Sequence, residues 1–216
     1  PHDFLRRRQH QAAGVRVVGV HQDIPFRAGQ DRGHQQDGAS CFFQPQVANV
    51  LPQAAGSRVV LGTGTHTATL SLFAASRNQS IVGLDGNSLS SVNNGSNGTT
   101  GTLTLGTNSI SAESFNFQGK IGSTAASNDN IAVIKNGAGN QTLSGDNLFT
   151  GSLTINGGTL KMGHANALGS TTGGTIINSG GTLDLNGFTP GTSEAITITG
   201  VRISAKIIRL ACTVSV

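Results

Sequence analysis

The most constraining feature of this sequence is a short stretch that occurs twice. Residues 155–163 read INGGTLKMG, and residues 177–187 read INSGGTLDLNG, so the two starting isoleucines are 22 positions apart. A repeat of about 20 to 25 residues, built of strands and turns, has the size of one coil of a β-solenoid. Because a single coil cannot bury its own apolar side chains, the repeat predicts a stack of coils, about five to six over residues 78–200.

Short alternating units support this prediction. In each unit two apolar residues flank one polar or small residue, and Gly, Asn, Ser and Thr separate the units. Alternation with a period of two predicts short β-strands with one side facing a core, and no stretch has the apolar period of a helix. The units are Leu103/Leu105, Phe115/Phe117, Ile131/Val133, Leu153/Ile155, Leu160/Met162, Leu183/Leu185 and Ile196/Ile198.

The repeat also predicts contacts between neighbouring coils. If the leucines of the second copy point inward, Asp184 points outward, and Lys161 has the equivalent position one coil earlier. We expect these two side chains to lie side by side on the outer surface. The glycine pairs 157–158 and 180–181 precede strands and are expected at sharp turns, where φ is often positive. Corner positions that suit the left-handed conformation or asparagine ladders are predicted for Asn156, Asn166, Asn178 and Asn186.

The composition narrows the choice of partners. Charged residues make up 11% of the chain, and tryptophan and tyrosine are absent. Residues 57–200 hold two Arg and three Lys against four Asp and two Glu, so the net charge of +4 comes from the flanks. A nucleic-acid interface requires a basic patch and aromatic stacking platforms, so we expect no nucleic-acid partner. No window of about 18 consecutive apolar residues occurs, so we expect no membrane-spanning helix.

Composition divides the chain into three parts. Residues 1–56, rich in Gln, Arg and His, are interpreted as a leader that is disordered, poorly packed or translated in the wrong frame. Residues 57–200 hold 25 of the 31 glycines and form the predicted solenoid. Residues 201–216 lose glycine and alternate apolar with polar residues, which predicts either a capping strand or a tail that follows a frame slip. Cys41 and Cys212 lie in the flanks and indicate neither a disulfide framework nor a metal site.

The order of short motifs across residues 131–187 carries a family resemblance. Residues 135–151 read KNGAGNQTLSGDNLFTG, and LTINGGTL at 153–160, ANALGS at 165–170 and GGTLDLNG at 180–187 follow them. This series resembles the autotransporter-associated β-strand repeat, and segments 81–84, 102–106 and 117–122 resemble the region that commonly precedes it. Leu148 and Phe149 stand where an aromatic such as tyrosine is usual. The resemblance implies a right-handed parallel β-helix in the secreted passenger region of a bacterial surface protein, without a shared catalytic site.

Candidate chemistry is sparse. The carboxylates of Asp129, Asp146 and Asp184, with Lys161 as a partner, are the candidates for acid–base catalysis in a β-helix enzyme. Their spacings of 17 and 38 residues do not both fit one coil, so solvated surface or corner positions are the preferred interpretation. The six histidines lack metal-ligand spacing. Glycines 62/64 and 137/139 lack the third glycine and the helix of a phosphate loop. We therefore expect no catalytic, cofactor-binding or metal-binding residues and no cofactor.

The sequence as a whole predicts an all-β chain that forms a right-handed parallel β-helix, or β-solenoid, with poorly structured flanks. The predicted function is a non-catalytic structural segment of an autotransporter-like passenger, an extended stalk that supports adhesion. Two alternatives remain open: a β-helix enzyme that acts on polysaccharides, and an adhesin that binds specific glycans. Surface glycans or other cells are the expected partners. We expect the chain to be part of a longer protein that is extracellular or at the cell surface, with outer-membrane association through its parent.

Overall fold

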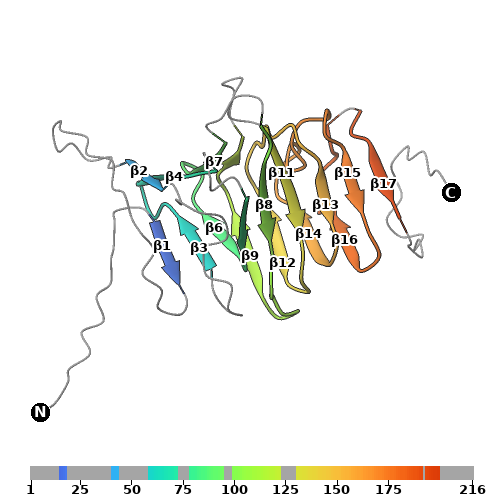
Figure 1. The fold of residues 1–216 in the computed structure, drawn as a ribbon, viewed down its shortest axis with the longest axis horizontal. Coiled ribbons are helices and arrows are strands. Elements are labelled where there is room, and N and C mark those ends of the chain that lie inside the picture. The colour runs from blue at the N-terminus through green and yellow to red at the C-terminus, as the bar shows by residue number, and fades with distance from the viewer. Residues whose placement is uncertain are drawn as a thin grey trace, which may run out of the picture.

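The computed structural model of the chain describes residues 58–72, 78–94, 99–122, 130–191 and 193–199, together with the backbone of two short strands at 15–18 and 40–43. These residues form seventeen β-strands and no helix, and the strands stack side by side along one long axis (Figure 1). Within this part of the chain, therefore, nothing has the length and apolarity of a membrane-spanning helix.

The strands belong to three sheets, which we call faces 1, 2 and 3. Face 1 contains β5 (Asn78–Ile81), β8 (Gly101–Leu105), β11 (Ile131–Lys135), β13 (Leu153–Ile155), β15 (Thr175–Ile177) and β17 (Ile196–Ile198). Face 2 contains β1 (Val15–Val18), β3 (Arg58–Leu61), β6 (Leu84–Gly86), β9 (Ser114–Phe117), β12 (Asn140–Leu143), β14 (Gly158–Met162) and β16 (Gly181–Asp184). Face 3 contains β2 (Ser40–Phe43), β4 (Thr67–Ser71), β7 (Ser91–Asn93) and β10 (Lys120–Ile121).

The chain visits the faces in a fixed order, and each strand pairs with the strand of the next coil. Every pairing is parallel except that of β1 with β3. The six strands of face 1 mark five coils between β5 and β17. The structure therefore confirms the predicted all-β parallel solenoid and its coil number.

The register confirms the repeat that the sequence contains. Ile155 pairs with Ile177, and Leu160 pairs with Leu183. Coil length varies along the stack: Leu103 to Val133 is a step of 30 residues, whereas Val133 to Leu153 is a step of 20. The most regular coils are thus those that carry the motif series of residues 131–187.

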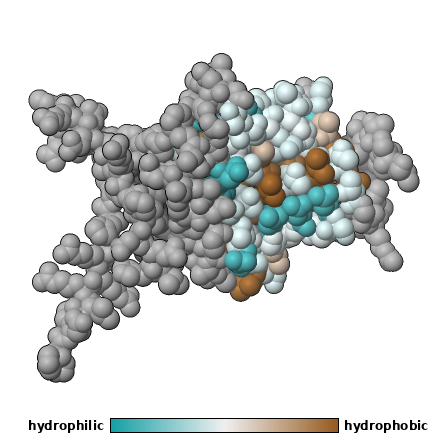
Figure 2. Space-filling view, in the orientation of Figure 1, coloured by the Kyte–Doolittle hydropathy of each residue, from teal (hydrophilic) through white to brown (hydrophobic). Residues whose placement is uncertain are grey.

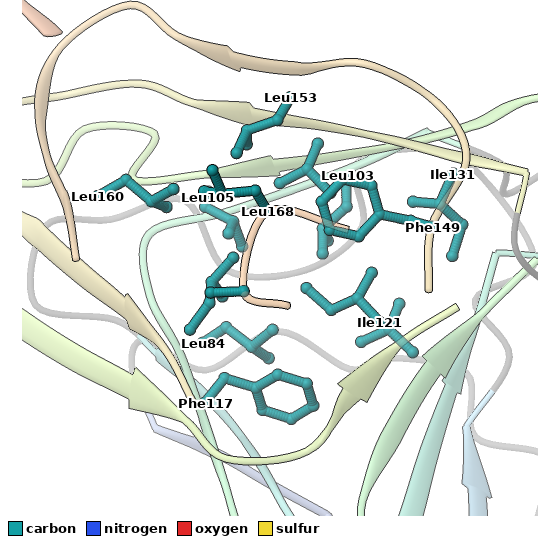
Figure 3. Packing of buried hydrophobic residues seen from close by; sticks show 14 of the residues in the cluster. Leu84, Leu103, Leu105, Phe117, Ile121, Ile131, Phe149, Leu153, Leu160 and Leu168 are labelled. Atoms are coloured by element: carbon teal, nitrogen blue, oxygen red, sulfur yellow. The ribbon is translucent and has the colours of Figure 1, made fainter. Parts of the chain in front are cut away.

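The interior is a continuous apolar column. Side chains at equivalent positions of successive coils, such as Leu103, Val133 and Leu153, are fully buried on top of one another. Figure 3 shows Leu103, Leu153 and Phe149 pointing into the same interior. Each buried Leu, Ile or Phe contributes about 1.5–3 kcal/mol relative to an exposed one. Because each coil exposes its interior until a neighbour covers it, this contribution depends on stacking.

Positive φ occurs at one glycine of each predicted pair and, among the four predicted corner asparagines, only at Asn186. Gly158 and Gly180 have positive φ angles of 64° and 93°, and Asn186 has a φ of 48°. A Cβ atom on Gly158 would lie 2.4 Å from the Gly139 carbonyl oxygen of the preceding coil. This position thus requires glycine both for its backbone angle and for the close approach of two coils.

One junction in face 2 is held by a side chain. β6 and β9 are joined by a single residue pair, Gly86 with Phe117. Gln141, which is almost fully buried in β12, reaches across this coil to the backbone of Leu84. Its Nε2 donates to the Leu84 carbonyl at 2.8 Å, and its Oε1 accepts from the Leu84 N–H at 3.2 Å. The amide therefore satisfies the N–H and carbonyl of Leu84, a residue that pairs with Val59 in β3 but has no register partner in β9.

Face 3 ends at β10, and a second buried amide continues the connection between coils. The Ile121 N–H donates to Asn147 Oδ1, and Asn147 Nδ2 donates to the Ala167 carbonyl, both at 2.9 Å. In the later coils this third side consists of segments 144–152 and 163–174 without paired strands. The third side of the later coils is therefore irregular, and a cavity lies on this side.

Some expectations fall outside the described residues. Residues 201–216 and all but two short strands of residues 1–56 belong to this group, as do Asp129 and Cys212. The interpretations of the leader and of the terminal segment therefore stay predictions.

Candidate binding surface

Charged side chains on the outer surface join neighbouring coils. Arg58 Nη1 lies 3.2 Å from Asp85 Oδ2, and Lys161 Nζ lies 4.0 Å from Asp184 Oδ2. A third pair joins Lys120 Nζ to Asp146 Oδ2 at 3.8 Å. The predicted contact of Lys161 with Asp184 is confirmed. Each pair is at least partly exposed and contributes about 0–1 kcal/mol, so these contacts fix the register more than they stabilise the fold.

An asparagine ladder runs along the corner between faces 1 and 2. Asn178 Nδ2 donates to Asn156 Oδ1 at 2.7 Å, and Asn156 Nδ2 donates to Asn136 Oδ1 at 2.9 Å. The Thr199 hydroxyl donates to Asn178 Oδ1 and extends the ladder by one coil. The sequence predicted Asn156 and Asn178 as corner residues but missed Asn136, although it too directly follows a strand of face 1.

The outward side of face 1 is uncharged among the described residues. Register places the following residues in one row along the stack: Ser80, Thr104, Ile134, Thr154, Ile176 and Thr197. Figure 2 shows separate hydrophobic patches on the visible face, next to a hydrophilic stripe that runs along the stack. This surface presents short hydroxyl and aliphatic groups in alternation, and it holds no group suited to acid–base chemistry.

Lys135 occupies an inward position that apolar residues fill in the neighbouring coils. It pairs with Leu105 and Ile155, and it is 1% exposed. Its Nζ donates to the carbonyls of Asn136 at 2.6 Å and of Gly137 and Gly157 at 3.1 Å each. Burial lowers the pKa of Lys135 from 10.5 to about 8. The sequence signal for this inward lysine is the alternation along β11, in which Ile131, Val133 and Lys135 are the buried positions.

A cavity of about 290 Å³ opens on the third side of the later coils, and we call it the lateral cavity. It lies between segments 144–152 and 163–174 and the residues Gly191 and Glu194, where face 3 has no paired strands. Its polar lining includes Asn166, Ser170, Thr171 and Glu194. The sequence had marked only Asn166 of these, and only as a corner residue, because segments far apart in the chain form the cavity.

Two polar side chains of the lateral cavity are held in place by hydrogen bonds. Asn166 Nδ2 donates to Asp146 Oδ1 at 2.7 Å, and the hydroxyl of Thr175 donates to Glu194 Oε1 at 2.7 Å. Burial raises the pKa of the Glu194 carboxyl, and the hydrogen bond from Thr175 opposes this change. Both side chains are therefore oriented before any ligand arrives.

The two described candidate carboxylates, Asp146 and Asp184, make separate ion pairs. Asp146 pairs with Lys120, whereas Asp184 pairs with Lys161. His66 Nδ1 lies 3.1 Å from the Thr63 carbonyl, and His164 Nδ1 accepts from the Asn166 N–H at 3.0 Å. Over the described ranges, no three His, Cys, Asp or Glu side chains are grouped so that they could hold a metal ion. Each described aspartate and histidine named here thus has a local structural contact.

Parallel coils, which are 20 to 22 residues long from β11 to β15, and a ladder of corner asparagines define this chain as a repeat solenoid. Residues 133–162, from β11 to β14, match the passenger-associated-transport-repeat. The adhesin BmaC autotransporter of Brucella suis biovar 1 (strain 1330) is 42% identical over 89 residues. That alignment covers 41% of this chain and 2% of the adhesin. No solved structure matches the chain significantly. The resemblance inferred from residues 131–187 is therefore confirmed.

Proposed function

We propose that this chain is a non-catalytic structural segment of an autotransporter passenger, exposed outside the cell or on its surface, where it acts as an extended stalk. The observation that carries this proposal is the continuous pairing of faces 1 and 2 from coil to coil. Each added coil lengthens such a stack by about 4.8 Å, the spacing of neighbouring strands. Each further repeat therefore makes the stack longer without requiring a new kind of coil.

A role in adhesion is supported by the similarity to a protein named as an adhesin. The chain spans 2% of the length of that relative, so the similarity concerns one repeat region of a much longer protein. A stalk supports adhesion by holding binding elements away from the membrane. Surface glycans or other cells are the partners that this role implies, and outer-membrane association comes through the parent protein.

The alternative of a polysaccharide-active enzyme has less support. Hydrolysis of a glycosidic bond generally uses two carboxyl groups separated by about 5 to 10 Å across the bond. The described aspartates instead form ion pairs that join coils, and Glu194 is hydrogen-bonded to Thr175. The alternative of a glycan-binding adhesin is favoured by one observation, the lateral cavity.

Limited digestion of the full 216-residue chain with trypsin, followed by intact mass measurement, tests the stalk. Lys120, Lys135 and Lys161 all lie in paired strands, so cleavage there should be much slower than at the arginines of residues 1–56. The heat-denatured chain is the control and should be cut at all sites at similar rates. Equal rates in the native chain would show that the coils do not stack in solution.

A second experiment tests the location. Antibodies raised against residues 131–187 should label intact cells of the source bacterium, and external protease should remove the label. Labelling only after the cells are permeabilised would contradict a surface role.

A further inference from the structure

The lining of the lateral cavity favours a ligand rich in hydroxyl groups. Asn166 and Glu194 supply hydrogen-bond acceptors, and the hydroxyls of Ser170 and Thr171 both donate and accept. Leu148 and Leu168 supply an apolar wall. A saccharide matches this combination, because its hydroxyls donate and accept while the C–H faces of its rings pack on apolar surface.

The charge of the lining selects among saccharides. Among the described residues that line the lateral cavity there is no lysine, arginine or histidine, and Glu194 is the one ionisable group. The nearby Lys120 already pairs with Asp146. An anionic ligand would thus meet a carboxyl group without a compensating cation, which disfavours binding. We propose that the lateral cavity is a binding site for a neutral saccharide.

The geometry of Asn166 supports this site. Its Nδ2 is engaged by Asp146, so the amide orientation is fixed and Oδ1 faces the backbone of Gly191. A Cβ atom on Gly191 would lie 3.8 Å from this oxygen. Within the described part of the chain Asn166 Oδ1 accepts no hydrogen bond, and it is thus available to a ligand hydroxyl. Because these groups are oriented in advance, binding costs little conformational entropy.

The size of the cavity limits the ligand. Its volume of about 290 Å³ is at the lower end of small-molecule sites, so it accommodates one or two sugar rings. This inference rests on the proposed surface location, since a saccharide of host glycoconjugates or of bacterial surface polysaccharides is encountered there. Host glycoconjugates and bacterial polysaccharides present the same kind of neutral sugar to the cavity, and the glycan array described next distinguishes between them.

A glycan array tests the proposal with the full chain. The array carries neutral di- and trisaccharides from both sources, together with sialylated and sulfated counterparts. We expect at least one neutral saccharide to bind with a Kd on the order of a millimolar or tighter. The anionic counterparts should bind at least about tenfold more weakly.

Two variants test whether the lateral cavity is responsible. Gly191→Leu adds a side chain where a Cβ meets only Asn166 Oδ1 at van der Waals distance, so it fills the cavity without a backbone clash. Glu194→Gln keeps the shape and removes the charge. We expect each variant to weaken binding of the saccharide selected on the array by about tenfold. A loss of this size corresponds to the removal of at least one hydrogen bond between the protein and the ligand. Thr182→Leu, at an exposed site in β16 on face 2, is the matched control and should bind as the unaltered chain does.

The outcomes separate this inference from the proposed function. Absence of binding to every neutral saccharide, preference for anionic ones, or unchanged binding by Gly191→Leu overturns the cavity proposal. Circular dichroism shows whether Gly191→Leu folds. If it does not, the unaltered chain is titrated with the saccharide, and the amide NMR shifts of Asn166 and Glu194 are followed. Unperturbed shifts would then overturn the cavity proposal. Protease resistance and surface labelling would still support the stalk in any of these cases.

Discussion

Because the ammonium group of Lys135 is buried, the free energy of unfolding of this solenoid should change with pH in the alkaline range. Its Nζ lies in the column, where neighbouring coils place Leu105 and Ile155, and three backbone carbonyls accept its hydrogen bonds. The protein must keep this group charged in a desolvated place at neutral pH. Lys135→Met removes the charge and retains an unbranched side chain of similar length.

The magnitude follows from the pKa. A pKa lowered from 10.5 to about 8 corresponds to a cost of about 3 kcal/mol for the charged form in the folded state. Below a pH of about 8 the lysine is charged in both states, and the whole cost applies. Between about 8 and 10.5 the folded lysine is neutral while the unfolded one still binds a proton, so the free energy of unfolding rises with pH. From about pH 7 to about pH 9.5 the expected gain is about 2 kcal/mol.

Chemical denaturation followed by far-UV circular dichroism measures this gain, because the chain has neither tryptophan nor tyrosine as a fluorescent probe. A thiol reductant keeps Cys41 and Cys212 reduced at alkaline pH. The quantity to compare is the unfolding free energy of the unaltered chain minus that of Lys135→Met, at about pH 7 and about pH 9.5. Subtraction cancels the other titrating groups, and the difference should increase by about 2 kcal/mol in favour of the unaltered chain.

Lys161→Met is the matched control, since Lys161 lies on the outer surface and pairs with Asp184. It should change the free energy of unfolding by no more than about 1 kcal/mol. A difference between the unaltered chain and Lys135→Met that stays constant with pH would refute the burial of the ammonium in the column.

Three further substitutions test other parts of the stack, each by the same denaturation assay. Asn156→Ala, in the middle of the asparagine ladder, removes two hydrogen bonds and should lower the free energy of unfolding by about 1–2 kcal/mol. An unchanged free energy of unfolding would mean that the ladder does not stabilise the fold. Gly158 has a positive φ and lies close to Gly139, so Gly158→Ala should lower the free energy of unfolding by about 2 kcal/mol or more. Gly157→Ala should lower it clearly less. Equal losses for the two variants would contradict the left-handed conformation of Gly158. Phe149→Ala should cost about 3–5 kcal/mol because the ring is fully buried, and a loss below about 1 kcal/mol would place the ring outside the core.

The spacing of the repeat allowed much of this fold to be predicted. The duplicated isoleucine and leucine positions fix which residues of two coils pair, and from this pairing the contact of Lys161 with Asp184 follows directly. Alternation within each strand then predicts which side chains are buried. Such inferences succeed because a solenoid is nearly one-dimensional, so that neighbours in space are separated by one coil length in sequence.

The lateral cavity was beyond prediction because no single coil contains it. Segments 144–152 and 163–174 form it together with Gly191 and Glu194, at a side where strand pairing stops after β10. The same reason applies to Asn147 and Gln141, whose amides connect to backbone groups in other coils. A polar residue in a motif of fixed order gives no indication of which distant backbone group it will satisfy.

The sequence by itself determined the parallel stack, the coil length and the inward and outward positions of the repeat, because these depend only on local periodicity. The tertiary structure alone decided that Lys135 is buried against three carbonyls, that two buried amides replace missing ladder bonds, and that Asn166 and Glu194 share a cavity. Those features depend on where irregular segments of successive coils meet, and that placement is set by packing and by the need to satisfy buried polar groups.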